Sequence, residues 1–170
     1  MVRRHIQSPS TLVSESMTIE ISLRDVKEGD LPIFFEQQFD PVATRMAAFP
    51  ARGYEEFMAH WTNCLADETA ILKTIVFDGN VAGNIVCWVL AGEHKVGYWL
   101  GKEYWGKGIA TAGLAQFLDL VTVRPLYAHV AKSNVASIRV LRKGGFTILG
   151  EESFYHDGQM DLEFIMELGA

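Results

Sequence analysis

The sequence predicts an α/β (α+β) fold with a single mixed, mainly antiparallel central sheet of about seven strands and about four flanking helices. Three observations support this prediction. The 170 residues have the length of one domain. Hydrophobic residues make up 49% of the chain and charged residues 21%, the balance of a folded globular protein. Segments with period two alternate with segments of helical period, which implies one sheet with helices on its faces.

The first part of the chain is polar and rich in serine over residues 1–17. We expect these residues to form a flexible extension before a single domain over 18–170. The alternation of apolar and polar residues over 19–23 indicates the first strand. Asp30 is expected to cap a helix that runs from 31 to about 39.

A second helix is predicted after Pro50, where large apolar residues recur at helical spacing. These residues are Tyr54, Phe57, Met58, Trp61 and Leu65. Such a stripe indicates a core face or the wall of a substrate groove.

An antiparallel meander of three strands is predicted next, followed by two further helices and three further strands. The meander comprises residues 70–77, 81–90 and 94–100, with turns at Asp78-Gly79-Asn80 and near Gly92. A helix then presents Ala110, Leu114, Phe117, Leu118 and Val121 on one face and stops before Pro125. The remaining elements are a strand at 126–130, a helix at 134–143 ended by Gly144-Gly145, and a hairpin turning at Asp157-Gly158.

Composition excludes several classes of function. The net charge of −6 and the lack of a long basic run argue against a nucleic-acid partner. No apolar stretch approaches the roughly 20 residues that span a bilayer, and no signal peptide is apparent, so we expect a cytoplasmic protein without a membrane segment. Cys64 and Cys87 form no C-x-x-C pair, and neither shows a local sign of activation by histidine, so no metal site or thiol nucleophile is expected.

The segment between the strand at 94–100 and the next helix is Tyr104-Trp105-Gly106-Lys107-Gly108-Ile109-Ala110. Glycines there allow close approach of the backbone to a ligand, and the free N–H groups of a helix start favour a pyrophosphate. Lys107 can add a positive charge. A P-loop would need Ser or Thr where Gly108 stands, and the dinucleotide pattern G-x-G-x-x-G fails at Thr111.

Two sequence blocks carry a family resemblance. Gly97-Tyr98-Trp99-Leu100 with Trp105-Gly106-Lys107-Gly108-Ile109-Ala110 resembles the acetyl-CoA signature Q/R-x-x-G-x-G/A of the GNAT superfamily. Trp105 in place of Gln or Arg, together with Thr111, resembles the branch of ribosomal-protein N-terminal (alanine) acetyltransferases. The second block runs from Asn134 to Leu141 and closes with Lys143-Gly144-Gly145-Phe146, similar to the N-x-x-S helix of that branch.

The resemblance implies that acetyl-CoA is the cosubstrate and that its pantetheine arm inserts between splayed strands at 94–100 and 126–130. The implied cofactor-binding residues are Trp99, Leu100, Trp105, Gly106, Lys107, Gly108, Ile109, Ala110, Thr111, Asn134 and Arg139. Asn134 is equally suited to cap its helix. A backbone N–H near Leu100 would stabilise the oxyanion while an amine attacks the thioester directly.

The resemblance also assigns the proton transfers. Many relatives protonate the departing thiolate with a Tyr at the position of Leu141; Ser137 inherits this role by position, although a Ser there can simply bond the backbone. The Glu that relatives often use as general base is replaced by Lys95. We therefore take Glu152 on the last hairpin as the base, with Glu151, His156, Glu93 and His94 as alternatives, and interpret His60 and His129 as structural.

The expected function is N-acetylation of a protein N-terminus or a small-molecule amine. One alternative is a catalytically weak CoA-binding module for regulation or sensing, because Tyr is missing at 141 and Glu at 95. Another is an enzyme that transfers a longer acyl group. Pairing through the edge of the last strand would give a homodimer.

Overall fold

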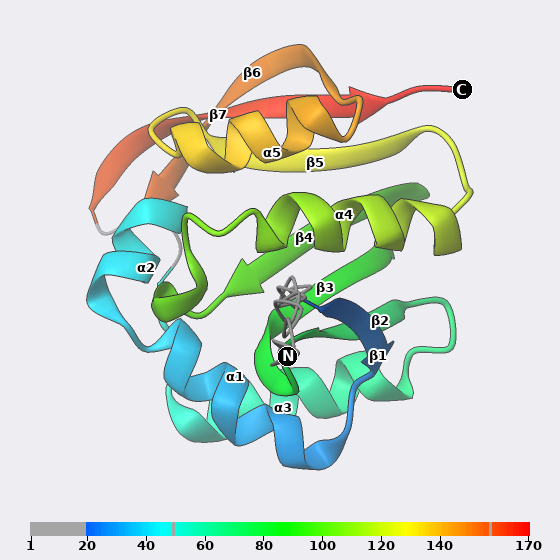
Figure 1. Cartoon of the computed structure of the whole chain (residues 1–170). Helices are drawn as coiled ribbons and strands as arrows, with labels where there is room; N and C mark the ends of the chain where they lie inside the picture. Colours follow the sequence, from blue (N-terminus) through cyan, green and yellow to red (C-terminus); the bar gives the residue numbers. More distant parts are fainter. Residues whose placement is uncertain (1–19, 49, 157) are drawn as a thin grey trace, which may run out of the picture.

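The computed structural model describes residues 20–48, 50–156 and 158–170, so the expected extension over 1–17 lies outside the described residues (Figure 1). Seven strands form one sheet in the order β1-β2-β3-β4-β5-β7-β6, which confirms the predicted sheet. The strands are β1 (Ile21–Asp25), β2 (Ile71–Phe77), β3 (Asn80–Leu90), β4 (Glu93–Leu100), β5 (Leu126–Ala131), β6 (Thr147–His156) and β7 (Gln159–Leu168). The helices of the described residues are α1 (Leu31–Gln38), α2 (Pro41–Ala47), α3 (Tyr54–Ala66), α4 (Ile109–Leu120) and α5 (Val135–Lys143).

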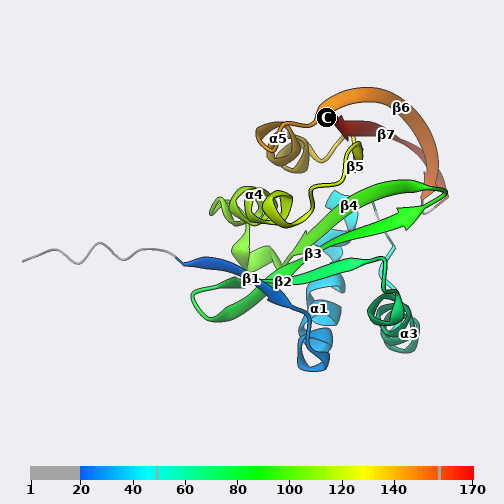
Figure 2. The same ribbon diagram turned by 90° about the vertical axis from the view of Figure 1, so that its right-hand side faces the viewer.

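Helices cover both faces of the sheet. Figure 2 shows α4 and α5 on one side and α1 and α3 on the other. The larger core lies under α4 and α5, where Leu114 and Phe117 pack against Ile75 and Ile85. The smaller core joins Phe57 and Trp61 of the predicted aromatic stripe to α1, whereas Tyr54 and Leu65 are exposed. No helix in the described part of the chain is long and apolar enough to cross a bilayer.

The centre of the sheet contains its one parallel pair. Within the described residues, β4 and β5 pair only at His94 with Leu126 and Lys95 with Tyr127. Beyond Lys95 the two strands separate, and this confirms the predicted splay. The opening faces α2 and the loop that precedes α4 (Figure 1).

The edge strands are β1 and β6. The prediction that the last strand forms an edge is wrong, because β7 lies between β5 and β6 and pairs with both. An edge available for self-association would therefore belong to β6.

Helix α2 was not predicted, although its start has clear local signals. Pro41 occupies the first helical position, and the Asp40 carboxylate accepts hydrogen bonds from the N–H groups of Val42 and Ala43. The helix is only seven residues long, too short for a helical period to stand out. It matters because it lies at the open end of the splay.

Asp30 occupies the N-cap position of α1, as predicted, but its side chain makes no capping hydrogen bond. Its buried carboxylate instead accepts two hydrogen bonds from the Arg24 guanidinium, at 2.7 and 2.8 Å, and one from the Thr74 hydroxyl at 2.7 Å. Burial alone would raise the pKa of Asp30, but these bonds and one from the Lys27 N–H outweigh it and lower the pKa to about 2. The carboxylate thus ties β1, β2 and α1 together.

We expect Asp30→Asn to reduce the free energy of unfolding by about 3 kcal/mol, because it leaves Arg24 without its buried partner. The matched control is Asp25→Asn, which removes an exposed partner of Lys73 and should change stability by less than about 1 kcal/mol. Since the pKa of Asp30 is lowered on folding, its contribution is present at neutral pH and is lost as pH falls from about 4 to about 2. Urea unfolding of both variants at several pH values measures the free energy of unfolding. An equal decrease in the Asp30→Asn and Asp25→Asn variants would contradict the prediction.

Candidate active site

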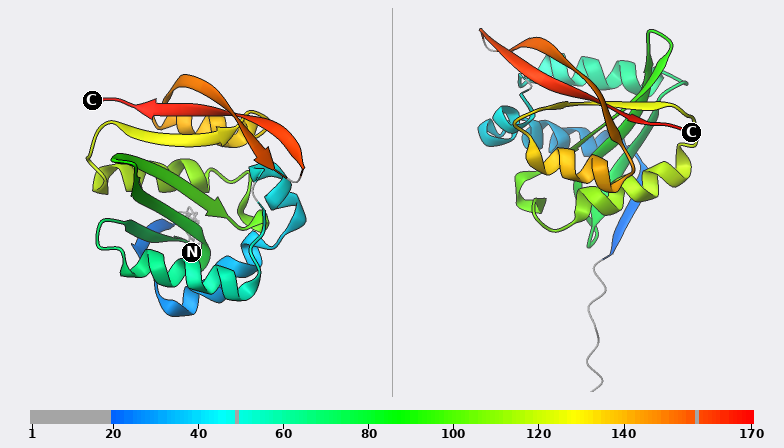
Figure 3. Two further views of the ribbon diagram at one scale, coloured as in Figure 1. Left: turned by 180° about the vertical axis from the view of Figure 1, so that it is seen from behind. Right: turned by 90° about the horizontal axis from the view of Figure 1, so that it is seen from above.

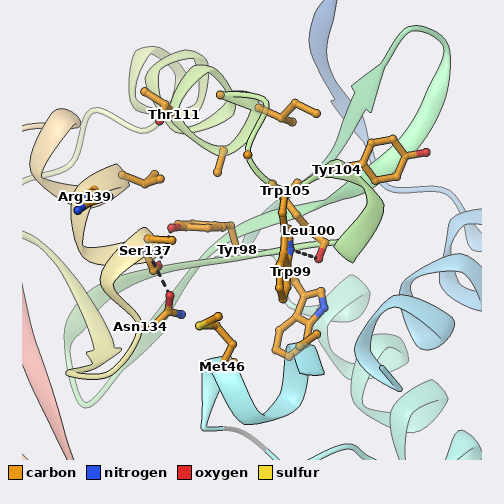
Figure 4. Close-up of a pocket in the computed structure, with 18 of the residues that line it drawn as sticks. Met46, Tyr98, Trp99, Leu100, Tyr104, Trp105, Thr111, Asn134, Ser137 and Arg139 are labelled. Carbon is orange, nitrogen blue, oxygen red and sulfur yellow. Dashed lines mark hydrogen bonds between the residues drawn. The ribbon is translucent and has the colours of Figure 1, made fainter. Parts of the chain in front are cut away.

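A pocket of about 360 Å³ lies at the open end of the β4–β5 splay (Figure 4). Its walls come from α2, the end of β4, the loop before α4, the first turn of α4, and α5. The predicted site residues that line it are Trp99, Leu100, Trp105, Gly106, Gly108, Ile109, Ala110, Thr111, Asn134, Ser137 and Arg139. The segments 99–111 and 134–139, which are separate in sequence, are therefore brought together around one cavity.

The loop before α4 has the backbone geometry of an anion site. Gly106 and Gly108 adopt left-handed φ values of 72° and 75°, and Gly108 is the N-cap of α4 without a side chain to bond the first turn. The first N–H groups of a helix have no partner within that helix, so those of α4 are free to bind a ligand in the pocket. The Trp105 indole N–H donates to the Leu100 carbonyl at 3.2 Å and closes the loop.

The opposite wall is the start of α5. Asn134 acts as a cap, because its side-chain oxygen accepts a hydrogen bond from the Ser137 N–H at 3.2 Å, and it also lines the pocket. Arg139 and Lys143 from the same helix line the pocket as well, and both are positively charged. The site therefore combines an apolar channel with cations at its α5 side.

Tyr98 is a site residue to which the sequence analysis gave no role. Its hydroxyl lies 2.6 Å from the Ser137 hydroxyl, so the two side chains join β4 to α5 inside the pocket (Figure 4). Burial raises the pKa of Tyr98 to about 12, although the Ser137 hydrogen bond opposes this, and the phenol is protonated at neutral pH. Strand alternation could have found it, since Tyr98 shares its sheet face with Val96 and Leu100.

Two predicted residues are not brought to this pocket. The Lys107 side chain lies outside the lining, with its ammonium 5.7 Å from the centre of the Phe77 ring. Glu152 lies on β6, next to His129 rather than beside Ser137.

Cys64 has a histidine neighbour that the sequence analysis did not identify. Its sulfur lies 3.6 Å from His60 Nε2, one helical turn away on α3. Burial raises the pKa of the Cys64 thiol and lowers the pKa of His60, so both groups are held in their neutral forms. The pair consequently lacks the thiolate that a nucleophilic cysteine needs.

A second pocket of about 490 Å³ lies on the other side of β4, against α1 and α3. Aromatic side chains dominate its wall: Phe34, Phe57, Trp61, Trp88, Tyr98 and Trp99. Tyr98 and Trp99 line both pockets, so the two cavities meet across β4. This arrangement allows two ligands to approach the same point from opposite sides.

His129, interpreted from sequence as structural, is part of a charged cluster. Ligand atoms of His129, Glu152 and Glu163 lie within 4.8 Å of one another, a spacing that a metal ion could use. However, the other ring nitrogen of His129 lies 3.3 Å from the Lys95 ammonium, and a nearby cation disfavours a metal. These contacts fit a hydrogen-bonded network.

Residues 20–147 match the family model of the acetyltransferase (GNAT) domain. This range spans three quarters of the chain and includes every predicted cofactor-binding residue. The chain belongs to the GNAT acetyltransferase family. No curated protein matches it.

Solved structures of other GNAT proteins share the fold. A spermidine N-acetyltransferase from Vibrio cholerae, in complex with CoA and spermine, has a TM-score of 0.77 and 17% identity, over 88% of this chain and 95% of that chain. A ribosomal-protein-alanine N-acetyltransferase from Brucella melitensis has a TM-score of 0.75 and 19% identity, over 88% of this chain and 99% of that chain. An aminoglycoside acetyltransferase in complex with coenzyme A has a TM-score of 0.72 and 17% identity, over 88% of this chain and 95% of that chain.

Proposed function

We propose that this GNAT protein transfers the acetyl group of acetyl-CoA directly to a primary amine of a protein N-terminus or a small molecule. The observation that carries the proposal is the β4–β5 splay, which opens onto a pocket lined by the glycine loop and by α5. The second pocket, on the opposite face of β4, supplies a separate approach for the amine.

The pocket fits acetyl-CoA on three counts. The loop glycines leave open space where a side chain would project, since nothing lies within 4 Å of a Cβ built on Gly106 or Gly108. The first turn of α4 offers N–H groups to the pyrophosphate. Beyond Lys95, the β5-facing backbone of β4 has no strand partner in the described pairing, so the pantetheine arm can hydrogen-bond to it.

The chemistry is an acyl transfer. The amine attacks the thioester carbonyl carbon, a C–N bond forms, and a tetrahedral intermediate places negative charge on the former carbonyl oxygen. Backbone N–H groups of β4 near Leu100 would stabilise that charge. When the C–S bond breaks, the thiolate needs a proton.

Tyr98 and Ser137 are suited to supply that proton. If the Tyr98 phenol donates to the Ser137 hydroxyl at 2.6 Å, the Ser137 proton is free to point at the sulfur. This arrangement supports the role that the family resemblance gives to Ser137 and adds Tyr98 as its partner. It also explains how the site can work without a Tyr at Leu141.

We expect Tyr98→Phe and Ser137→Ala each to lower kcat by about 10- to 100-fold while the Kd for acetyl-CoA changes little, because the pair acts on the leaving group. The double variant should be no slower than the slower single one, since the two hydroxyls act as a unit. Ser153→Ala, at an exposed position on β6, is the control. Steady-state kinetics measure kcat, and titration calorimetry measures the Kd for acetyl-CoA. If the losses of the two single variants add up in the double variant, the two hydroxyls act independently, which would contradict this prediction.

The class of acceptor is proposed from the sequence resemblance. Solved GNAT structures include enzymes named for polyamine, aminoglycoside and ribosomal-protein acceptors. The segment Tyr104-Trp105-Gly106-Lys107-Gly108 supports the ribosomal-protein branch, and we favour an α-amine of a protein on that basis.

The test is CoA release from acetyl-CoA with an unblocked alanyl peptide, spermine and an aminoglycoside, each offered separately. Release that depends on one of them would establish the activity and name the acceptor class. Tight acetyl-CoA binding without acceptor-dependent release would point to a sensing module instead. Faster turnover of a longer acyl-CoA would assign the enzyme to another acyl donor.

A further inference from the structure

The second pocket meets the candidate site at the far half of β4. Ala47, Tyr98 and Trp99 line both cavities, so an amine that reaches the thioester from the second pocket has to lie beside these residues. From this junction the second pocket extends along α1 and α3. Figure 3, right, shows α3 (blue-green) across the sheet from α4 and α5. A ligand of the second pocket would therefore place its amine at the junction and the rest of its body beneath α3.

Aromatic rings form the body of the second pocket. The ring centres of Phe34 and Phe57 lie 5.1 and 6.3 Å from that of Trp61. On the sheet side the Trp88 ring lies over Gly97, since a Cβ built on Gly97 would be 3.3 Å from Trp88 Cζ3. The cavity of about 490 Å³ has the size of a small-molecule site and far exceeds the space that the methyl group of an alanine needs. It favours a large apolar group next to the amine.

Two side-chain amides line the pocket close to the junction. Gln38 is 7% exposed, and its buried side-chain nitrogen has no hydrogen-bond partner. Asn84 pairs with Trp99 across the strands, and its side chain makes no hydrogen bond to another described residue. The end of α1 lies at the same place, because the Trp99 indole N–H donates to the Gln37 carbonyl at 3.2 Å. Both amides are thus available to a ligand near Trp99.

The unpaired amide of Gln38 points to a ligand with an oxygen acceptor. A buried N–H without an acceptor is uncommon in folded proteins because it costs free energy. The amide can turn about its terminal bond and donate to an oxygen placed against the pocket wall. In an α-amino acid or an N-terminal residue, the amine and the carbonyl are attached to the same carbon. An α-amine at the junction therefore brings its own carbonyl close to Gln38 and Asn84, whereas a simple alkylamine has no such oxygen.

The charge of the pocket argues against a polycation. Asp67 is the one acidic residue in the described lining, and its Oδ1 already accepts from the Thr69 N–H and hydroxyl at 2.9 and 2.7 Å. Arg52 adds a positive charge to the same lining, and burial lowers the pKa of His60. A polyamine or an aminoglycoside carries several ammonium groups, each of which needs a negative partner when it leaves water. The pocket suits a molecule with a single amine.

Building on the proposed function, we propose that the acceptor is an α-amino acid unit with a large apolar or aromatic side chain. The unit is either a free amino acid or the first residue of a peptide. Its side chain lies among the rings of α1, α3 and β3, and its carbonyl accepts from Gln38 and Asn84. Its α-amine lies beside Tyr98 and Trp99 and attacks the thioester as described above. Gln38 and Asn84 are thus the residues that determine specificity.

Three model acceptors separate the contributions of the side chain and the carbonyl. L-Phenylalaninamide has both, L-alaninamide lacks the ring, and phenethylamine lacks the carbonyl. We expect kcat/KM for phenylalaninamide to exceed that for alaninamide about 100-fold, because the pocket buries the benzyl group. Phenethylamine should be about 30-fold poorer than phenylalaninamide, because two hydrogen bonds are lost. Rates are compared per concentration of unprotonated amine, since a neighbouring carbonyl lowers the pKa of an amine.

Gln38→Met tests the amide, because it keeps an apolar chain of similar length. We expect it to lower kcat/KM for phenylalaninamide about 5-fold and to leave that for phenethylamine unchanged. Tm should not fall, since an unpaired buried amide is removed. The matched control is Gln37→Met. Gln37 is also 7% exposed, but it lies outside the pocket lining and donates to the Val81 carbonyl at 3.2 Å, so this variant should lower Tm and keep the ratio of the two rates.

The two sources of the amino acid unit are distinguished by free L-phenylalanine and an unblocked peptide that begins with phenylalanine. Turnover of the free amino acid alone would assign a small-molecule acceptor. Turnover of the peptide alone would assign a peptide or protein N-terminus. Either result supports the proposal.

Calorimetry with CoA-saturated protein measures acceptor binding apart from transfer. If alaninamide, phenethylamine or spermine reacts as well as phenylalaninamide, or if Gln38→Met keeps the ratio of the two rates, the acceptor proposal is overturned and the proposed function stands. If phenylalaninamide binds more tightly than phenethylamine but no acceptor is acetylated, the occupant of the pocket is supported and the proposed function falls. If phenylalaninamide does not bind and no acceptor is acetylated, both fall.

Discussion

Replacing Gly108 by Glu is expected to weaken acetyl-CoA binding about 1000-fold. Gly108 lines the candidate site, holds a left-handed φ of 75° at the start of α4, and has open space where a side chain would project. A carboxylate there would repel the pyrophosphate and block its hydrogen bonds to the helix start. Losing two or three charge-assisted bonds amounts to about 4 kcal/mol, which corresponds to this factor.

The control for Gly108→Glu is Gly92→Glu. Gly92 has a φ of 80° in the β3–β4 turn and equally open surroundings, so the backbone strain of the two substitutions is matched. It lies outside the candidate site, and we expect the Kd measured by calorimetry to be unchanged. If both variants bind acetyl-CoA equally weakly, the cause is backbone strain in general. If Gly108→Glu still binds acetyl-CoA tightly, the loop does not bind the pyrophosphate.

Gly83→Ala is the second change with a large expected effect. A Cβ on Gly83 would lie 2.0 Å from the Trp99 carbonyl oxygen and 3.0 Å from Leu100 Cα, and backbone cannot yield as a flexible side chain can. The substitution must push β3 away from β4 where β4 borders the candidate site. We expect a loss of about 3 kcal/mol in unfolding free energy. Tm should fall by roughly 6–12 °C, and acetyl-CoA binding should weaken.

Gly150→Ala is the matched control for Gly83→Ala. Gly150 also lies in a strand, but nothing is within 4 Å of its added Cβ and its φ is not left-handed. Its effect should be within about 0.5 kcal/mol. Thermal unfolding followed by circular dichroism compares the two, and a stable Gly83→Ala variant would show that β3 and β4 can separate without penalty.

The glycine loop could be predicted because its signals are local. Gly106 and Gly108, the strand before them and the amphipathic helix after them are adjacent in sequence, so backbone geometry and ligand chemistry appear in one short segment. Asn134 at the start of α5 is a similar case, since a cap is recognised from the few residues that follow it. The family match over 20–147 confirms the resemblance that these segments indicated.

The contacts of Asp30 and His129 could not be predicted in the same way. Asp30 precedes a helix, as a cap does, yet in the packed structure its carboxylate accepts from Arg24 and Thr74 and makes no bond to the first turn of α1. His129 alternates in a strand among apolar residues and gives no sign that Glu163 lies beside it. Their partners come from other strands that are distant in sequence, so the residues around Asp30 and His129 do not indicate these contacts.

The sequence by itself determined the fold class, the order of the strands and of the helices other than α2, the position of the glycine loop and the family, because each depends on residues close together along the chain. Only the tertiary structure decided which side chains share the site. The pairing of β4 with β5 stops after two residue pairs, and this opens the pocket that joins Tyr98 to Ser137. The insertion of β7 between β5 and β6 brings Glu163 and Glu152 to His129. Such contacts depend on strand order and register, which arise when the whole sheet assembles and distant residues pack together.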